Sequence, residues 1–249
     1  MKRFYRIVSL LGVNMLLAAC STPPWVSLNS LNLYTIPNTT GKKPDTQLSL
    51  AVANPEITIV SSLGNTTNNV LAERLKYDAE KISCNIGSQL NSVLLAKGFT
   101  VTEVFPSLNH MTFSEKRNSS AVITARIRIV LTEDSKTTFQ ENWPLSVSGD
   151  IIASATAKLV AIEPLSKELI WIKDIPISDL TYPFNISGNA PQGTKTSVPP
   201  GFGDFAGTVD KILTKVNETV LLSAQKYIDH DEFLRLNDDI TKLKGIKRY

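Results

Sequence analysis

The sequence predicts an α+β fold, in which a mostly antiparallel β-sheet carries helices packed on one face as a two-layer sandwich. Three observations support this prediction. Apolar and polar residues alternate through residues 121–131 and 150–163, as in half-buried strands. Apolar residues recur at spacings of three and four in residues 69–97 and again after Asp204, as in amphipathic helices. The order is strand, helix, a run of antiparallel strands, then helices, without an internal repeat.

The first strand is predicted within residues 47–60, where large apolar residues alternate and Asn54-Pro55 marks a break or an edge position. A helix is predicted over residues 69–97, and Gly98 stands where a left-handed C-cap belongs. A strand over residues 99–104 follows at once, which makes a tight αβ connection. The helix stripe consists of Leu71, Leu75, Asp78, Ile82, Ile86, Gln89, Val93 and Leu94.

The central strands have two different faces. In residues 121–131 the isoleucines alternate with a polar face that carries Arg126 and Arg128. In residues 150–163 one face is rich in alanine, which leaves room for a bulky neighbour, most simply a helix lying across it. A turn at residues 163–167 and a return strand over residues 168–177 predict a hairpin. The alanine-rich face consists of Ile151, Ala153, Ala155, Ala157, Leu159 and Ala161.

The C-terminal part begins with a loop rich in proline and glycine over residues 183–203. A loop of this length inside a compact domain is usually functional or disordered. Asp204 is predicted to cap a second helix, and a third helical piece follows residues 229–231 and ends in a basic tail. The second helix would pack through Phe205, Val209, Ile212, Val216, Val220, Ala224 and Tyr227.

The N-terminus resembles the signal peptide of a bacterial lipoprotein. Three basic residues precede an apolar run over residues 7–17, which is too short for a membrane span of about 20 residues. The sequence Leu17-Ala18-Ala19-Cys20 then resembles a lipobox, which implies cleavage before Cys20 and attachment of fatty acyl chains, such as palmitate, to that residue. A plain secretory signal with a chance cysteine and an uncleaved anchor are the alternatives.

These features predict three segments: a lipoprotein signal peptide over residues 1–19, the lipidated Cys20 with a tether over residues 20–47, and a single α+β domain over residues 48–249. Leu28, Leu31, Leu33 and Tyr34 could form a short strand that docks on the domain. Several acyl chains hold a protein stably on a bilayer. Ser21 rather than Asp follows the cysteine, which favours the outer membrane over inner-membrane retention.

Composition excludes some classes of partner. The formal charge of +3 includes the three basic residues of the signal peptide, so the mature chain is neutral and nucleic-acid binding is not expected. The only cysteine besides Cys20 is Cys84, which is predicted on the flank of the helix, so an intramolecular disulfide is not expected.

The usual signatures of catalysis are missing from the sequence. His110 and His230 stand without ligand-spaced partners, so neither a metal site nor a cofactor is predicted. The sequence has no nucleophile elbow, Walker loop or dinucleotide-binding glycine motif. We therefore expect no catalytic residues and no enzymatic activity.

Four blocks of the sequence are similar to the Helicobacter adhesin A family, lipoproteins also called neuraminyllactose-binding hemagglutinins or flagellar sheath adhesins. They are residues 94–101 (LLAKGFTV), 113–116 (FSEK), 162–169 (IEPLSKEL) and the charged helical C-terminus. The resemblance implies a paralogue of the adhesin that is located in the outer membrane or flagellar sheath. It also implies sialylated host glycans as binding partners. The family segment Lys-Arg-Thr matches Lys136, Thr137 and Thr138 here, so these are the candidate glycan-binding residues, with Thr137 in place of the arginine.

That replacement changes the chemistry of the segment, because arginine can hold a carboxylate by two parallel hydrogen bonds whereas Lys136 offers a point charge.

The sequence is compatible with three functions. The protein is a glycan-binding adhesin that uses Lys136, Phe139 and Trp143 in loops, or a structural envelope lipoprotein that binds envelope or sheath proteins. The third is a small-molecule binder with a groove between the alanine-lined strand and a helix.

Overall fold

The computed structural model describes residues 31–37, 48–63, 68–138, 146–187 and 202–246. Side chains at several ends of these ranges, including residues 136–138, are not described. Residues 31–249 form one compact unit. In the described residues, seven strands form a single sheet with helices packed on it, so the predicted α+β fold is confirmed, and the sheet is partly parallel.

The first strand position is shared by β1 (Ser49–Ala53) and β2 (Glu56–Ser61). Both run parallel to β4 (Ala121–Thr138), and they are separated at the predicted break, Asn54-Pro55. Proline has no N–H to give to a sheet ladder, which explains the interruption. The backbone at the break is held from other elements, because the Asn54 N–H donates to the carbonyl of Phe105 and the Ser83 hydroxyl donates to the carbonyl of Pro55.

The long helix α1 (Asn68–Ala96) matches the predicted helix to within one residue at each end. Gly98 follows it with a positive φ of 85°, which confirms the predicted left-handed position that glycine adopts without a steric penalty. The chain then enters β3 (Thr100–Phe105), which pairs with β1 in parallel. Strand β1, helix α1 and strand β3 therefore make a β-α-β connection between neighbouring strands.

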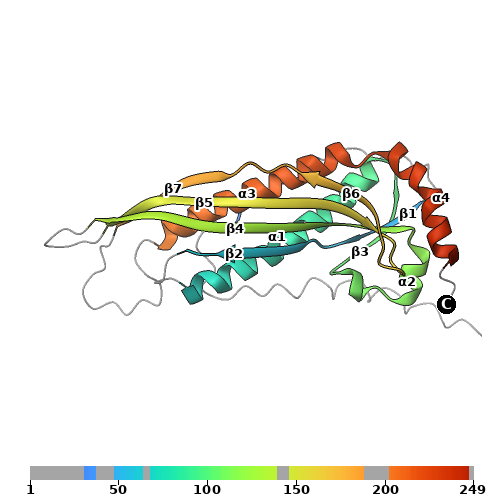
Figure 1. Cartoon of the computed structure of the whole chain (residues 1–249), viewed down its shortest axis with the longest axis horizontal. Coiled ribbons are helices and arrows are strands. Elements are labelled where there is room, and N and C mark those ends of the chain that lie inside the picture. Colours follow the sequence, from blue (N-terminus) through green and yellow to red (C-terminus); the bar gives the residue numbers. More distant parts are fainter. Residues whose placement is uncertain (1–30, 38–47, 64–67, 139–145, 188–201, 247–249) are drawn as a thin grey trace, which may run out of the picture. The chain divides into compact units, whose positions relative to one another are not determined.

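A 3-10 turn, η1 (Leu108–His110), and the short helix α2 (Phe113–Asn118) lead into β4. Strand β4 pairs antiparallel with β5 (Ser146–Ile162) from Val122 opposite Ile162 to Thr138 opposite Ser146. The two strands are longer than predicted and lie side by side in Figure 1. The extra length includes residues 132–138, where the apolar alternation stops, because backbone pairing can extend a hairpin without a buried face.

The far edge is formed by β6 (Leu169–Ile175) and β7 (Leu180–Ser187), which both pair antiparallel with β5 and share one strand position. The predicted hairpin of β5 and β6 is confirmed. Two more helices follow, α3 (Phe202–Tyr227) and α4 (His230–Ile246). Helix α3 begins before Asp204, so the prediction that Asp204 is its N-cap is wrong. Asp229 caps α4, because its carboxylate accepts from the backbone N–H of Glu232 at 2.9 Å.

The main core lies between one face of the sheet and helices α1 and α3. A second, smaller cluster is buried on the other side of the sheet, where Leu108 of η1 packs on it; it consists of Ala51, Ala53, Phe105, Met111 and Val122. Helix α1 contacts β1, β2 and β3, and helix α3 contacts β5, β6 and β7. Figure 1 shows both helices on the same side of the sheet. The alanine-rich face of β5 is buried, and α3 contacts this strand, so the predicted helix across that face is confirmed. We call this side the covered face and the opposite side the open face.

Residues 31–37 dock on the core although they form neither helix nor strand, so the suggested short strand is absent from the described part of the segment. Leu31 and Ile36 are buried, and the Ile36 N–H donates to the side-chain oxygen of Gln89 on α1 at 2.9 Å. The predicted signal peptide, Cys20, Leu28 and most of the residue 183–203 loop lie outside the described residues. None of the helices in the described residues is long and apolar enough to span a membrane.

Candidate functional site

The residues matched to the family's glycan-binding segment are the last three of β4. Lys136, Thr137 and Thr138 pair with Ser148, Val147 and Ser146 of β5, so their backbone is an extended strand rather than the expected loop. Their side chains, together with Phe139 and Trp143, lie outside the described residues. The segment therefore lies at the C-terminal end of β4, whose first residue is Ala121. Glycan binding by this segment stays a prediction.

The two histidines have local partners. His110 shares a hydrogen bond of 2.8 Å with the hydroxyl of Ser107, and His230 packs on the Phe99 ring with a centroid separation of 5.2 Å. The described residues contain no group of three or more histidine, cysteine, aspartate or glutamate side chains that could hold a metal ion. Cys84 is exposed on α1, and the Asn54 amide lies 3.7 Å from its sulfur.

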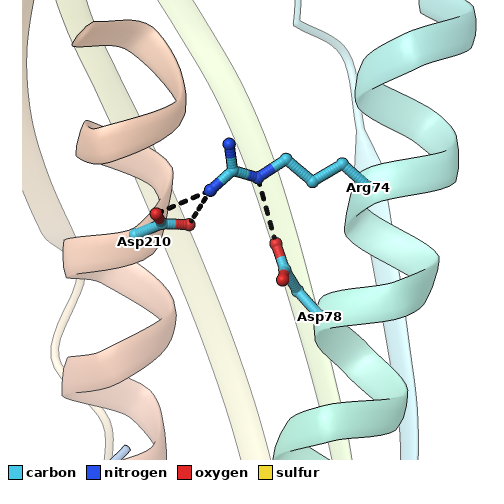
Figure 2. Close-up of polar contacts among 3 residues, drawn as sticks. All are labelled: Arg74, Asp78 and Asp210. Carbon is cyan, nitrogen blue, oxygen red and sulfur yellow. Dashed lines mark hydrogen bonds and ion pairs between the residues drawn. The ribbon is translucent and has the colours of Figure 1, made fainter. Parts of the chain in front are cut away.

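A charged cluster joins the two long helices beneath the sheet (Figure 2). Arg74 of α1 donates from one terminal nitrogen to both carboxylate oxygens of Asp210 on α3, at 2.7 and 2.6 Å. The Nε of Arg74 donates to the carboxylate of Asp78, one turn further along α1, at 3.4 Å. One guanidinium therefore serves two carboxylates and connects α1 to α3.

The cluster is largely removed from solvent, since Asp78 is 5% exposed and Asp210 is 8% exposed. Burial raises the pKa of both carboxyls, although the positive charge of Arg74 and more weakly that of Lys81 oppose this shift. The negative charge of Asp78 adds to the rise at Asp210. Such an arrangement can hold two helices together and take up a proton, and it offers no nucleophile or metal-ligand set.

Asp78 belongs to the predicted apolar stripe of the helix, and the sequence predicted no role for it. An aspartate inside an apolar stripe, four residues after an arginine, is the signal that could have identified half of the cluster. Asp210 could not have been found in this way, because it comes from a helix that begins more than a hundred residues later.

A second polar network lies where α4 approaches α2. The Lys244 ammonium donates to the backbone carbonyls of Arg117 and Ser119 at 3.2 and 2.5 Å, and burial lowers its pKa. Glu163 is 1% exposed and accepts from the backbone N–H groups of Leu165 and Ser166 at 3.2 and 2.5 Å. These contacts satisfy buried polar groups and fix the β5–β6 turn and the end of α2, so we assign them a structural role.

The open face carries exposed charged and hydroxyl side chains. Arg126 and Arg128 are exposed on β4, and the β4–β5 register places them opposite Lys158 and Thr156. On the other side they face Glu56 and Thr58 of β2. The Lys158 ammonium pairs with the carboxylate of Asp174 on β6 at 3.0 Å. In the described part of the chain, neither arginine makes a side-chain hydrogen bond or an ion pair.

Comparison with known proteins gives a fold and leaves the function open. No family model and no curated protein match the sequence. Among solved structures, a neuraminyllactose-binding hemagglutinin homolog from Helicobacter pylori has a TM-score of 0.56 and 16% identity, covering 82% of this chain and 97% of that chain. The likeness to this protein confirms the predicted resemblance at the level of the fold.

Two further solved structures are more distant. The hypothetical protein CT253 from Chlamydia trachomatis has a TM-score of 0.25 and 13% identity, covering 70% of this chain and 98% of that chain. A minor lipoprotein from Acinetobacter baumannii has a TM-score of 0.25 and 10% identity, covering 72% of this chain and 92% of that chain.

Proposed function

We propose that this protein is a lipoprotein anchored in the bacterial outer membrane through Cys20, whose folded unit binds other molecules and catalyses no reaction. The observation that carries this proposal is the fold shared with the hemagglutinin homolog over almost the whole length of that protein. The lipobox-like sequence at residues 17–20 supports the anchor. The open face of the sheet supports a binding role, since it presents exposed polar groups that packing does not require.

The finer form of the proposal is a cell-surface or flagellar-sheath adhesin, paralogous to Helicobacter adhesin A, that binds sialylated host glycans. It draws on the sequence blocks shared with that family and on the name of the structural neighbour. Lys136, Thr137 and Thr138 are the glycan contacts proposed from the family match. Lysine at the first of these positions would attract a sialic acid carboxylate as a point charge.

The glycan proposal is tested by calorimetry on the full-length protein in detergent micelles, with sialyllactose compared against lactose. We expect binding that depends on sialic acid and that weakens in Lys136→Ala. Lys211→Ala is the matched control, because Lys211 is an exposed lysine on α3. The absence of a sialic-acid-dependent signal at millimolar sugar would contradict the adhesin proposal.

A structural role in the envelope is the second candidate, and the same open face favours it, because its exposed side chains on β2, β4 and β5 form a surface on which a protein can dock. Cross-linking in intact cells followed by purification would then capture a defined envelope or sheath protein. Substitutions on the open face would abolish this capture, whereas substitutions on the exposed side of α4 would not.

The membrane anchor is tested separately. Cys20→Ser removes the thiol that accepts the lipid, so we expect loss of acylation and release of the protein from the membrane fraction. Acylated, membrane-associated protein in this variant would contradict the anchor.

A further inference from the structure

We propose that Arg126 and Arg128 form a binding site on the open face for the carboxylate of an acidic sugar. The inference rests on the proposed glycan-binding function and names a location and a ligand chemistry for it. The site differs from the family-matched segment, because residue 136 is the eighth position after Arg128 along β4, a separation of about 26 Å in an extended strand.

The two guanidinium groups share one face of one strand. Residues two apart in a strand point to the same side and lie about 6–7 Å from each other, so both side chains can reach a single ligand. The isoleucines on either side of Arg128, Ile127 and Ile129, are 3% and 1% exposed, so they fix the strand's orientation by packing on the covered face. The arginines are thereby presented outward on a rigid strand, and in the described residues neither has a side-chain hydrogen bond or an ion pair.

The cross-strand neighbours make this part of the sheet receptive to an anion. Arg126 lies directly opposite Lys158, and like charges in that position destabilise a sheet. Glu56 and Asp174 sit on the flanking strands, and Asp174 already holds Lys158. A carboxylate bound between Arg126 and Arg128 would add negative charge on β4, where neither arginine makes an ion pair in the described residues.

Arg128 has a different neighbourhood, which points to a sugar. The register places it between Thr58 of β2 and Thr156 of β5, and both threonines are exposed. Arginine binds a carboxylate by a two-pronged fork, and hydroxyl groups can donate to or accept from the ring hydroxyls of a sugar. An arginine with a threonine on each side therefore suits a ligand that carries a carboxylate next to several hydroxyls.

The surroundings of the site favour a sugar over a lipid surface. Apolar side chains with substantial exposure on this face, Val60 and Ile172, belong to β2 and β6 rather than to the two central strands. Membrane-surface binding uses a continuous apolar area with basic residues around it. The centre of this face instead combines charge and hydroxyl groups, so an acidic membrane is an alternative outcome of the test.

The test compares four forms of the full-length protein in detergent micelles: wild type, Arg126→Gln/Arg128→Gln, Lys136→Ala and Arg235→Gln. Arg235 is an exposed arginine on α4 and serves as the matched control. The probes are sialyllactose, a hyaluronan tetrasaccharide as a carboxylate-bearing sugar without sialic acid, and neutral lactose. Thermal unfolding of each variant verifies that the fold is retained.

We expect the wild type to bind at least one acidic sugar in preference to lactose, with an affinity that falls as salt is added. The double arginine variant should lose at least about tenfold in affinity, as expected for removal of charge-assisted hydrogen bonds. Arg235→Gln should retain binding of both acidic sugars. Lys136→Ala should retain binding of the tetrasaccharide, which lacks the sialic acid that the proposed function assigns to Lys136. If the tetrasaccharide binds and sialyllactose does not, the inferred site stands and the sialyl specificity of the proposed function fails.

Three outcomes would overturn the inference. Loss of sialyllactose binding in Lys136→Ala with full retention in the double arginine variant would support the adhesin function and place its site elsewhere. Absence of acidic-sugar binding by the wild type would reject the site. That result would leave the lipid anchor untouched, because Cys20→Ser tests the anchor independently. Binding of phosphatidylglycerol vesicles in place of sugars, lost in the double variant, would assign the arginines to a membrane surface.

Discussion

The two faces of the sheet are built from the same strands and have opposite chemistry. On β4 and β5, Ile127, Ile129, Ala155 and Ala157 are buried beneath the helices. The residues between them in the sequence, among them Arg126, Arg128 and Thr156, are exposed on the open face. Because side chains alternate along a strand, one backbone can supply a packed core and a binding surface at adjacent positions.

This difference separates the residues that hold the protein together from those that are free to serve a ligand. Side chains on the covered face are constrained by volume, since α3 lies across the alanines and α1 lies over the neighbouring strands. The exposed side chains of the open face, such as Arg126 and Thr156, are constrained by solubility and sheet pairing. Buried polar side chains also occur in the covered layer, among them Asn217 of α3 and the Arg74–Asp78–Asp210 cluster (Figure 2), in which Arg74 links α1 to α3.

The largest expected effect comes from removing apolar volume on the covered face. Ile129→Ala should lower the free energy of unfolding by roughly 2–5 kcal/mol, because the lost contacts and the resulting cavity both cost stability. The neighbouring open-face substitution Arg128→Ala should change it by less than about 0.5 kcal/mol. Urea unfolding followed by circular dichroism measures both values. Similar losses in the two variants would show that the open face is covered in solution.

An intermediate effect is expected from adding volume. Ala157→Leu should destabilise the protein by about 1–3 kcal/mol, because the alanine side chain is 3% exposed and the helix above it must shift. Thr156→Leu, one residue earlier on the open face, should be tolerated within about 0.5 kcal/mol. The midpoint of thermal unfolding compares the pair, and equal tolerance at both positions would contradict tight packing under α3.

The smallest expected effect is a pH dependence from the buried cluster. Burial raises the pKa of Asp78 and of Asp210, so the folded protein binds protons there more tightly than the unfolded chain does. The associated stability is present in full below the ordinary carboxyl pKa and is lost as pH rises through the raised folded pKa. Arg74 and Lys81 limit this effect because both lower the pKa of the two carboxyls.

The measurement is urea unfolding of wild type and Asp78→Asn from neutral pH down to about pH 4, near the ordinary pKa of an aspartate. As pH falls, the wild type should gain stability relative to the variant, whose side chain cannot ionise. Asp238→Asn, at an exposed position on α4, is the control and should show a constant difference. A constant difference for Asp78→Asn as well would show that the buried carboxyl does not titrate in this range.

Much of the fold could be predicted because it depends on local patterns. Alternation identified the two faces of β4 and β5, proline marked the break between β1 and β2, and glycine marked the end of α1. The parallel pairing of β1 and β2 with β4 could not be predicted, because a strand pattern carries no information about its partner. The length of the β4–β5 hairpin was underestimated, since backbone pairing continues where the apolar alternation stops.

Two features of the candidate sites could also be predicted from the sequence. The sequence predicted an exposed arginine face, because alternation determines which side of a strand each residue occupies. It also carries the lipobox-like signal, because signal peptides are recognised as linear sequence.

The sequence by itself determined the local periodicities, the strand break and which residues share a face. Only the tertiary structure decided which faces meet. Arg74 and Asp210 are separated by 136 positions and come within 2.6 Å once α1 and α3 pack under one sheet. In the same way, Arg128 gains a threonine on each side only when β2 and β5 take their registers against β4. Periodicity is a property of a short segment, whereas these neighbours arise from contacts between segments far apart in the chain.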